Sequence, residues 1–179
     1  MPKPMPKLKR IGRQRIPKIS RHESLSRLFK NARLKFYAAK GSHTFAIGLI
    51  PHAMPGMQTA TVAKFNPAKR AFENFAECNL ALTGKGVYMG EASKQPEIYD
   101  RLKDGRDDFV RFYARQKTGF NIFRLFLNEA IALAKAQGLT EVSLTAQNVV
   151  LQEYYGRLGF KFEGKEGKGL FTIKPRPHS

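Results

Sequence analysis

Residues 138 to 160, GLTEVSLTAQNVVLQEYYGRLGF, contain polar side chains and two glycines at a spacing that few folds require. Asn148 is a favourable helix N-cap, because its side-chain oxygen accepts from the first free backbone N–H groups of a helix. A helix of about ten residues is predicted behind it, and Gly159 ends that helix because glycine adopts a left-handed C-cap without steric cost. Within it, Tyr155 is expected to be a buried aromatic residue whose phenol finds a hydrogen-bond partner. The apolar stripe of the helix recurs at three and four residues and consists of Leu151, Tyr154, Tyr155 and Leu158.

The segments on both sides of this helix have the period-two pattern of strands. Val142, Leu144 and Ala146 alternate with polar residues, which predicts a strand with one covered face. After the helix, Phe160 and Phe162 alternate with charged residues in the same way. The sequence therefore predicts a strand, a capped helix and a second strand in succession.

This run resembles the second half of the GNAT N-acetyltransferases, with the best match over residues 116 to 174. In that family, Asn ends a strand, and a small or apolar residue follows three positions later. An aromatic residue and Tyr come at six and seven, and Gly-Phe comes at eleven and twelve. Every offset is matched here, although Leu151 replaces the usual Ala. The matching residues are Asn148, Leu151, Tyr154, Tyr155, Gly159 and Phe160. A strand-helix-strand unit with the same packing and no chemistry is the alternative.

A second match precedes the first by 27 residues, counted from Asn121 to Asn148. The family has Gln/Arg-x-x-Gly-x-Gly/Ala where a long helix begins, and the free N–H groups and positive dipole end of that helix bind the pyrophosphate of acetyl-CoA. Gln116 and Gly119 agree with this pattern, whereas Asn121 departs from Gly/Ala. The segment 107–115 in front of the loop fits a strand or a helix. The loop residues are Gln116, Lys117, Thr118, Gly119, Phe120 and Asn121.

The resemblance implies that acetyl-CoA is the co-substrate of an N-acyltransferase. An amine must lose a proton to attack the thioester, and the leaving thiolate must gain one. Tyr155 stands where the family has its proton-donating tyrosine, and Asn148 would contact the pantetheine arm or only cap the helix. The base stays open among Glu73, Glu77 and His52, which lie on or next to predicted strands.

Charge is the other functional signal, because a net charge of +18 on 179 residues implies an anionic partner. Residues 1–20 are predicted to be a disordered basic arm, since the first 21 residues hold eight Lys or Arg, several prolines and no acid. The residues from 22 to 179 keep a charge of +10, so the folded body is basic as well. We expect RNA or DNA as a partner of the arm and the surface, and a merely solubilising terminus is the alternative.

The remaining elements complete an α/β (α+β) fold, a GNAT-like mixed and mostly antiparallel sheet flanked by helices. A single domain is expected over residues 21–175. The periodicity predicts a helix from Arg21 through Ala39, and residues 84–108 are predicted to be a surface insertion that contains the hairpin GKGVYMGEA. Strands are predicted at 43–50, 58–65 and 75–83.

Other classes of chemistry find little support. The four histidines, 22, 43, 52 and 178, lack paired ligand spacing and the carboxylates are scattered, so no metal site is expected. A single cysteine excludes an internal disulfide, and no apolar run reaches membrane length, so we expect a soluble, cytoplasmic protein.

Three functions therefore compete. The first is an acyl-CoA-dependent N-acyltransferase whose amine acceptor is nucleic-acid-associated or otherwise anionic. The second is a catalytically inactive GNAT-fold protein that binds nucleic acid or belongs to a ribonucleoprotein or virion assembly, and the third is a basic structural α/β module. The spacing from Asn148 to Phe160 favours the first, and Asn121 favours the second.

Overall fold

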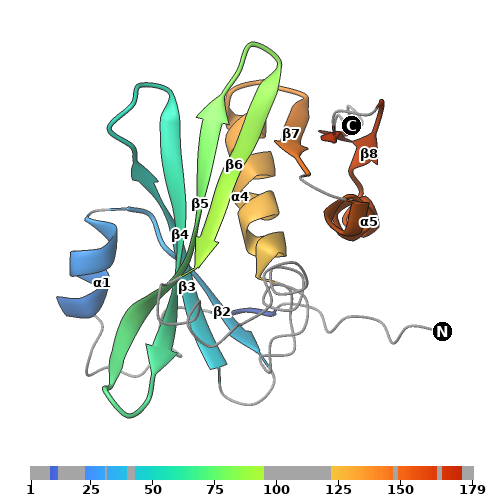
Figure 1. The fold of residues 1–179 in the computed structure, drawn as a ribbon. Coiled ribbons are helices and arrows are strands. Elements are labelled where there is room, and N and C mark those ends of the chain that lie inside the picture. Colours follow the sequence, from blue (N-terminus) through green and yellow to red (C-terminus); the bar gives the residue numbers. More distant parts are fainter. Residues whose placement is uncertain are drawn as a thin grey trace, which may run out of the picture.

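The computed structural model describes residues 9–11, 23–30, 32–39, 43–94, 122–146, 149–164 and 167–174. Strands predominate in the first half of the chain, and helices and strands alternate in the second half (Figure 1). In chain order they are β1 (Lys9–Ile11), α1 (Glu23–Phe29), β2 (Lys35–Ala39), β3 (His43–Pro51), β4 (Met57–Asn66), β5 (Ala71–Leu82), β6 (Gly86–Lys94), α4 (Phe123–Ala136), β7 (Glu141–Thr145), α5 (Val149–Arg157), β8 (Lys161–Phe162) and β9 (Lys168–Thr172).

All of these strands belong to one sheet of nine strands in the order β1-β2-β3-β4-β5-β6-β7-β9-β8. Every neighbouring pair is antiparallel except β6 and β7, which run parallel. Parallel neighbours need a crossover connection, and α4 lies within it. The fold class predicted from the sequence, a mixed and mostly antiparallel sheet flanked by helices, is confirmed.

Helices cover the two faces of the sheet at different places, with α1 on one side and α4 and α5 on the other (Figure 1). On the α1 side, Leu25 and Phe29 pack on apolar residues of β2 to β5. On the other side a larger cluster joins α4 and α5 to strands β3 to β7. Side chains alternate between the faces along each strand, and each buried apolar side chain of a strand belongs to one of these two cores. The larger core includes Phe45, Ile47, Val62, Cys78, Leu80, Val87, Met89, Phe123, Phe126, Ala130, Val142, Leu144, Tyr154, Tyr155 and Leu158.

Several sequence predictions are confirmed by these elements. The strands predicted at 43–50, 58–65 and 75–83 correspond to β3, β4 and β5. The strand, helix and strand predicted after Gly138 correspond to β7, α5 and β8. Gly138 and Gly159 both have positive φ, +68° and +106°, as expected of glycines that end helices.

The predicted helix from Arg21 through Ala39 is wrong in its second half. The helix α1 ends at Phe29, Lys30 has a φ of +28°, and residues 35–39 form the strand β2. Phe36 is buried between the half-buried residues Lys35 and Tyr37, which is the alternation of a strand. Apolar residues at 34, 36 and 37 also fit a helical stripe, so the pattern alone does not distinguish a helix from a strand. The segment is a strand because it pairs with β3.

The prediction that residues 84–108 form a surface insertion is also wrong for its first part. Residues 86–94 form β6, a central strand between β5 and β7, and Val87 and Met89 on it are almost fully buried. The glycines of this segment gave the pattern of a turn. Gly86, however, allows β6 to lie close to β7, because a Cβ there would overlap the backbone carbonyl of Glu141 on β7. Residues 95–108 lie outside the described residues.

The predicted disordered arm contributes three residues to the sheet, since Lys9–Ile11 form β1 and pair with β2. Beside β1, Lys35 of β2 donates to both carboxylate oxygens of Glu129 on α4, at 2.7 and 2.9 Å. Burial and the Glu129 charge raise the pKa of the neighbouring Tyr37. This ion pair ties α4 to the edge of the sheet. Among the described helices none is long and apolar enough to span a membrane.

Candidate active site

The two parallel strands part before they end, and this opening is the centre of the candidate site. β6 pairs with β7 from Gly86 opposite Glu141 to Met89 opposite Leu144, and the pairing stops there. Beyond that point β6 continues to residue 94 along β5, whereas β7 ends one residue later, at Thr145, which still pairs with Lys168 of β9. In open α/β sheets, ligands bind outside the carboxyl ends of strands where neighbouring chains diverge. The edge of β6 beyond Met89 is therefore free of β7 and faces this opening.

A β-bulge lies at the same place. The pairing of β5 with β6 shifts by one residue between Cys78 and Leu80, and the extra residue is on β6 between Met89 and Ala92. A bulge leaves one residue outside the regular ladder and bends its strand, which is why bulges are frequent next to active sites. Here the bend coincides with the point where β6 leaves β7.

The carboxyl end of β7 is closed by the chain that leads into β9. The backbone N–H of Ala146 donates to the carbonyl oxygen of Gly167 at 2.8 Å. Gly167 has a φ of +67°, and a Cβ at this residue would overlap the carbonyl oxygen of Ala146. Glycine is required by both its backbone angle and this close approach. The contact holds the chain in front of β9 against the end of β7.

Tyr155 of α5 lies within an aromatic cluster that joins both helices on this face of the sheet. Its ring is 5.0 Å from that of Phe123 at the start of α4, 5.3 Å from Tyr154 and 6.1 Å from Phe160. The residue is only 6% exposed. The cluster therefore fixes the phenol beside the first turn of α4, whose N-terminal end carries no acidic residue.

Burial raises the pKa of the Tyr155 phenol well above its usual range, and the nearby Cys78 and Tyr88 add to this effect. Cys78 lies at the bulge, with its Sγ 4.0 Å from the carbonyl oxygen of Gly90, and Tyr88 is next to the last residue of β6 that pairs with β7. Tyr155 is thus close to the point where the strands part. At neutral pH it is a protonated phenol, which can donate a proton or a hydrogen bond.

Cys78 itself is not suited to nucleophilic chemistry. Its side chain is completely buried, and burial raises the pKa of the thiol to about 12. The thiolate is the reactive form of cysteine, so a buried thiol that stays protonated is inert. Cys78 is a packing residue of the floor of the site.

On the opposite face of the sheet, Tyr88 connects the two parting strands. Its hydroxyl donates to Oγ1 of Thr145 at 3.3 Å, from β6 to β7. Val87 and Met89, the neighbours of Tyr88, point into the α4 core, so Tyr88 points away from it. The opening therefore has an aromatic, apolar side at α4 and α5 and a polar side on the other face.

The predicted site residues divide into one described residue and seven that are not. The loop 116–121 and Asn148 lie outside the described residues, which resume at Ile122 and Val149 respectively. Both therefore adjoin described elements of the site, α4 and α5. The roles predicted for Gln116, Lys117, Thr118, Gly119, Phe120, Asn121 and Asn148 stay predictions.

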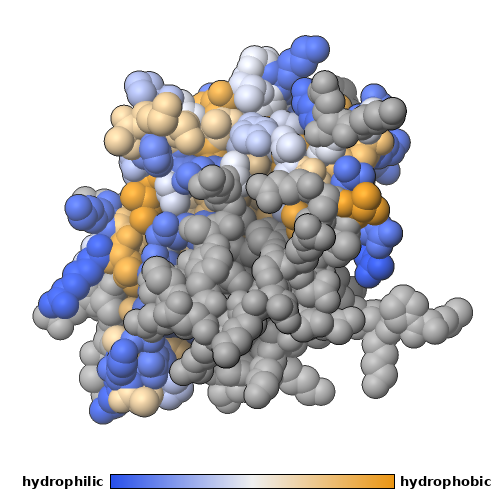
Figure 2. Space-filling model, in the orientation of Figure 1, coloured by the Kyte–Doolittle hydropathy of each residue, from blue (hydrophilic) through white to orange (hydrophobic). Residues whose placement is uncertain are grey.

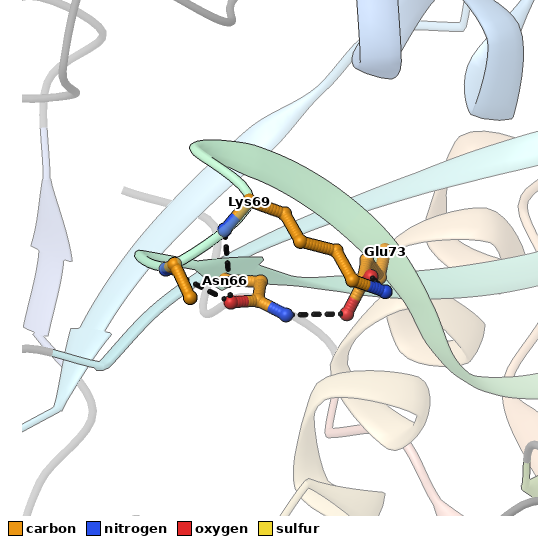
Figure 3. A network of polar contacts seen from close by, with 4 residues as sticks. Asn66, Lys69 and Glu73 are labelled. Atoms are coloured by element: carbon orange, nitrogen blue, oxygen red, sulfur yellow. Dashed lines mark hydrogen bonds and ion pairs between the residues drawn. The ribbon is translucent and has the colours of Figure 1, made fainter.

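The three candidate bases lie in different places. His52 is in the turn after β3, where its Nδ1 accepts from the backbone N–H of Met54 at 3.0 Å, at the end of the sheet where β6 begins. Glu73 is in the β4–β5 hairpin and accepts from Lys69 at 2.7 Å and from Asn66 at 3.0 Å (Figure 3). These hydrogen bonds lower the pKa of Glu73. Neither residue is positioned at the opening.

Glu77 is the candidate that lies nearest to the opening. Its Cα partner on β6 is Ser93, in the part of β6 that has already left β7. Its neighbour Cys78 points into the α4 core, so Glu77 points to the opposite face. From the sequence alone, Glu77 was one of three candidate bases, and Tyr88 and the bulge were not predicted. A glycine inside a strand, Gly90, is the local signal that indicates a bulge.

Comparisons with known proteins bear on the fold. Neither a family model nor a curated protein matches this chain. Among solved structures, it is similar to the KacTA–DNA complex, with a TM-score of 0.44 and 12% identity over 68% of this chain and 70% of the other. AtaT complexed with acetyl-methionyl-tRNAfMet gives a TM-score of 0.40 and 14% identity over 65% and 71%. PaiA N-acetyltransferase from Thermoplasma acidophilum in complex with coenzyme A gives 0.38 and 18% over 65% and 61%. Likeness this weak does not by itself define a family or an activity for this chain.

Proposed function

We propose that this protein is an acyl-CoA-dependent N-acyltransferase that uses acetyl-CoA as co-substrate. The observation that carries the proposal is the buried, protonated phenol of Tyr155 beside the opening between β6 and β7. It supports an acyl transfer because the leaving thiolate gains a proton from a nearby hydroxyl, and the phenol of Tyr155 keeps its proton at neutral pH. The GNAT-like spacing from Asn148 to Phe160 supports the same activity.

The reaction exchanges one bond and one proton. The thioester supplies an activated acyl carbon; a C–N bond forms to the acceptor amine as the C–S bond breaks. Tyr155 donates the proton that the sulfur takes up, and a base on the other face receives the proton that the amine loses. Glu77 is the carboxylate whose position favours that role. The backbone of β6 beyond Met89 offers hydrogen-bonding groups to an extended ligand in the opening.

The fit of a CoA thioester is supported by the chemistry around the opening. The first turn of α4 has no acidic residue, so its positive dipole end is compatible with phosphate. Gln116, Lys117, Thr118, Gly119, Phe120 and Asn121 directly precede that turn and would hold the pyrophosphate, and Asn148 would contact the pantetheine arm.

The acceptor is proposed to belong to an anionic carrier, RNA or DNA being the leading class. The support is the charge of +18, of which +10 remains on residues 22 to 179. On the face seen in Figure 2, strongly hydrophilic residues lie along the outer edges of the coloured part, with hydrophobic residues between them.

Asn121 favours a second candidate function, an inactive protein of the same fold that only binds nucleic acid. A side chain at this position occupies space that a pyrophosphate loop leaves open. Direct measurement of acetyl-CoA binding separates the two, because the enzyme requires the thioester and the inactive protein does not.

A further inference from the structure

A cluster of three polar side chains lies on the face of the sheet opposite Tyr155. Thr61 of β4 and Glu77 of β5 are direct partners across the two strands. The side-chain nitrogen of Asn74 donates to Oε1 of Glu77 at 2.5 Å. We refer to Thr61, Asn74 and Glu77 as the polar cluster.

A second bulge brings two of these residues together. The pairing of β4 with β5 shifts between Val62 and Ala63, and the extra residue is Phe75 on β5. Residues three apart in a regular strand point to opposite faces, so Asn74 could not reach Glu77 without this insertion. The bulge therefore creates the contact.

Two atoms of the polar cluster lack hydrogen-bond partners among the described residues. Thr61 is only 2% exposed, and its Oγ1 is unpaired. The Oδ1 atom of Asn74 is buried and unpaired as well. The amide of Asn74 cannot be turned around to relieve this, since its oxygen would then face the Glu77 carboxylate. Unpaired buried polar atoms destabilise a fold, so their presence here requires a reason.

Glu77 also differs from two other glutamates of the described residues, Glu129 and Glu73. Glu129 pairs with Lys35 and Glu73 pairs with Lys69. Glu77 forms no ion pair with any described Lys or Arg, in a chain that has 32 of these residues. The polar cluster thus combines a carboxylate without a cation with two unpaired oxygens.

We infer that the polar cluster binds the protonated primary amine of the acyl acceptor, an inference that rests on the proposed function. A primary ammonium group has three N–H donors and one positive charge. The cluster presents three acceptors, which are the Glu77 carboxylate, the Asn74 carbonyl oxygen and the Thr61 hydroxyl. An ammonium group would satisfy both unpaired oxygens and neutralise Glu77 at once.

The position of the polar cluster agrees with this role. Glu77 is opposite Ser93, in the part of β6 that borders the opening. Tyr155 approaches the opening from the α4 side and the polar cluster from the other side. An ammonium group held by the cluster would pass one proton to the Glu77 carboxylate, and the neutral amine so formed would meet a thioester held at Tyr155 at the opening, from the opposite face of the sheet.

The test uses the full chain without acetyl-CoA and n-butylammonium chloride as the probe. Its dissociation constant is obtained by NMR titration of backbone and side-chain amide signals. We expect saturable shifts at residues around Asn74, and no such shifts with butyltrimethylammonium, which has the same charge but no N–H donor. Glu77→Gln should weaken binding by about tenfold or more, because a charge-assisted hydrogen bond is lost. Glu73→Gln, on the same strand, is the matched control and should bind as the parent does.

Thr61→Val gives a second readout that a purely structural role would not produce. The variant should melt at a higher temperature than the parent without the probe, because an unpaired buried hydroxyl is removed, and it should bind the amine more weakly. Equal affinity of the parent and Glu77→Gln, or equal shifts with the quaternary probe, would overturn the inference. Because the amine titration contains no acetyl-CoA, it is independent of a separate titration with acetyl-CoA. If the amine binds and acetyl-CoA does not, only the proposed function is refuted. If acetyl-CoA binds and the amine does not, only the inference is refuted.

Discussion

Replacing Tyr155 by Phe removes one oxygen from the centre of the proposed site and keeps the ring. The contacts of the ring with Phe123, Tyr154 and Phe160, at 5.0, 5.3 and 6.1 Å, are retained. Truncation of such a buried ring to Ala costs about 3–5 kcal/mol, whereas loss of a hydroxyl hydrogen bond costs about 1 kcal/mol. The Phe variant should therefore fold and keep the acetyl-CoA affinity of the parent.

Its turnover should nevertheless fall by about 10² to 10⁴, the usual contribution of a positioned proton donor. The assay is the release of free CoA thiol from acetyl-CoA in the presence of a primary amine. Tyr154→Phe is the matched control, because Tyr154 is the adjacent tyrosine of the same helix and is equally buried, and its turnover should stay near that of the parent. Unchanged turnover of Tyr155→Phe, or an equal loss in both variants, would refute the reasoning.

The pH dependence follows from the same burial. The pKa of Tyr155 is raised above the ordinary value near 10, so the phenol keeps its proton as the pH rises toward about 10. Turnover should not decline below that pH through loss of this proton. A decline with an apparent pKa near 8, abolished in Tyr155→Phe, would contradict the burial of the donor.

Three further predictions concern other parts of the chain. Gly119→Glu should abolish the thermal stabilisation by acetyl-CoA, which is worth about 2.7 kcal/mol at a hundredfold excess over the dissociation constant, and an unchanged melting shift would exclude this loop from phosphate binding. Deletion of residues 1–20 should lower the affinity for RNA or duplex DNA. The slope of log affinity against log salt should also become shallower, by roughly 0.7 to 0.9 for each phosphate contact that is lost. Equal slopes for the two chains would show that the arm contacts no phosphate. Lys35→Met should destabilise the fold by about 3–5 kcal/mol in chemical denaturation, because Glu129 stays buried without its partner, whereas Lys69→Met at an exposed pair should cost less than about 1 kcal/mol.

Local patterns predicted the parts of the fold whose structure is decided locally. The alternation around Val142 and the glycine stops at Gly138 and Gly159 correctly predicted β7, α5 and the end of α4, because a helix end depends on the backbone freedom of one residue. Residues 35–39 could not be assigned in this way. Phe36 and Tyr37 fit both periodicities, and only pairing with β3 makes them a strand.

The candidate site was less accessible from the sequence. The opening exists because β6 and β7 pair only as far as Met89 and Leu144, two residues far apart in the chain. The proximity of Cys78 and Tyr88 to Tyr155 likewise arises from packing between distant segments. Tyr155 could be selected because the spacing of its helix resembles that of the GNAT N-acetyltransferases, whereas Glu77 became the favoured base only through its place in the sheet.

Titration of the full chain with acetyl-CoA in an isothermal calorimeter tests the central claim most directly. We expect saturable binding at one site per chain, with free coenzyme A competing for the same site. If concentrated acetyl-CoA produces no binding heat and leaves the melting temperature unmoved, the chain is not an acyl-CoA-dependent transferase, and the opening between β6 and β7 serves another purpose.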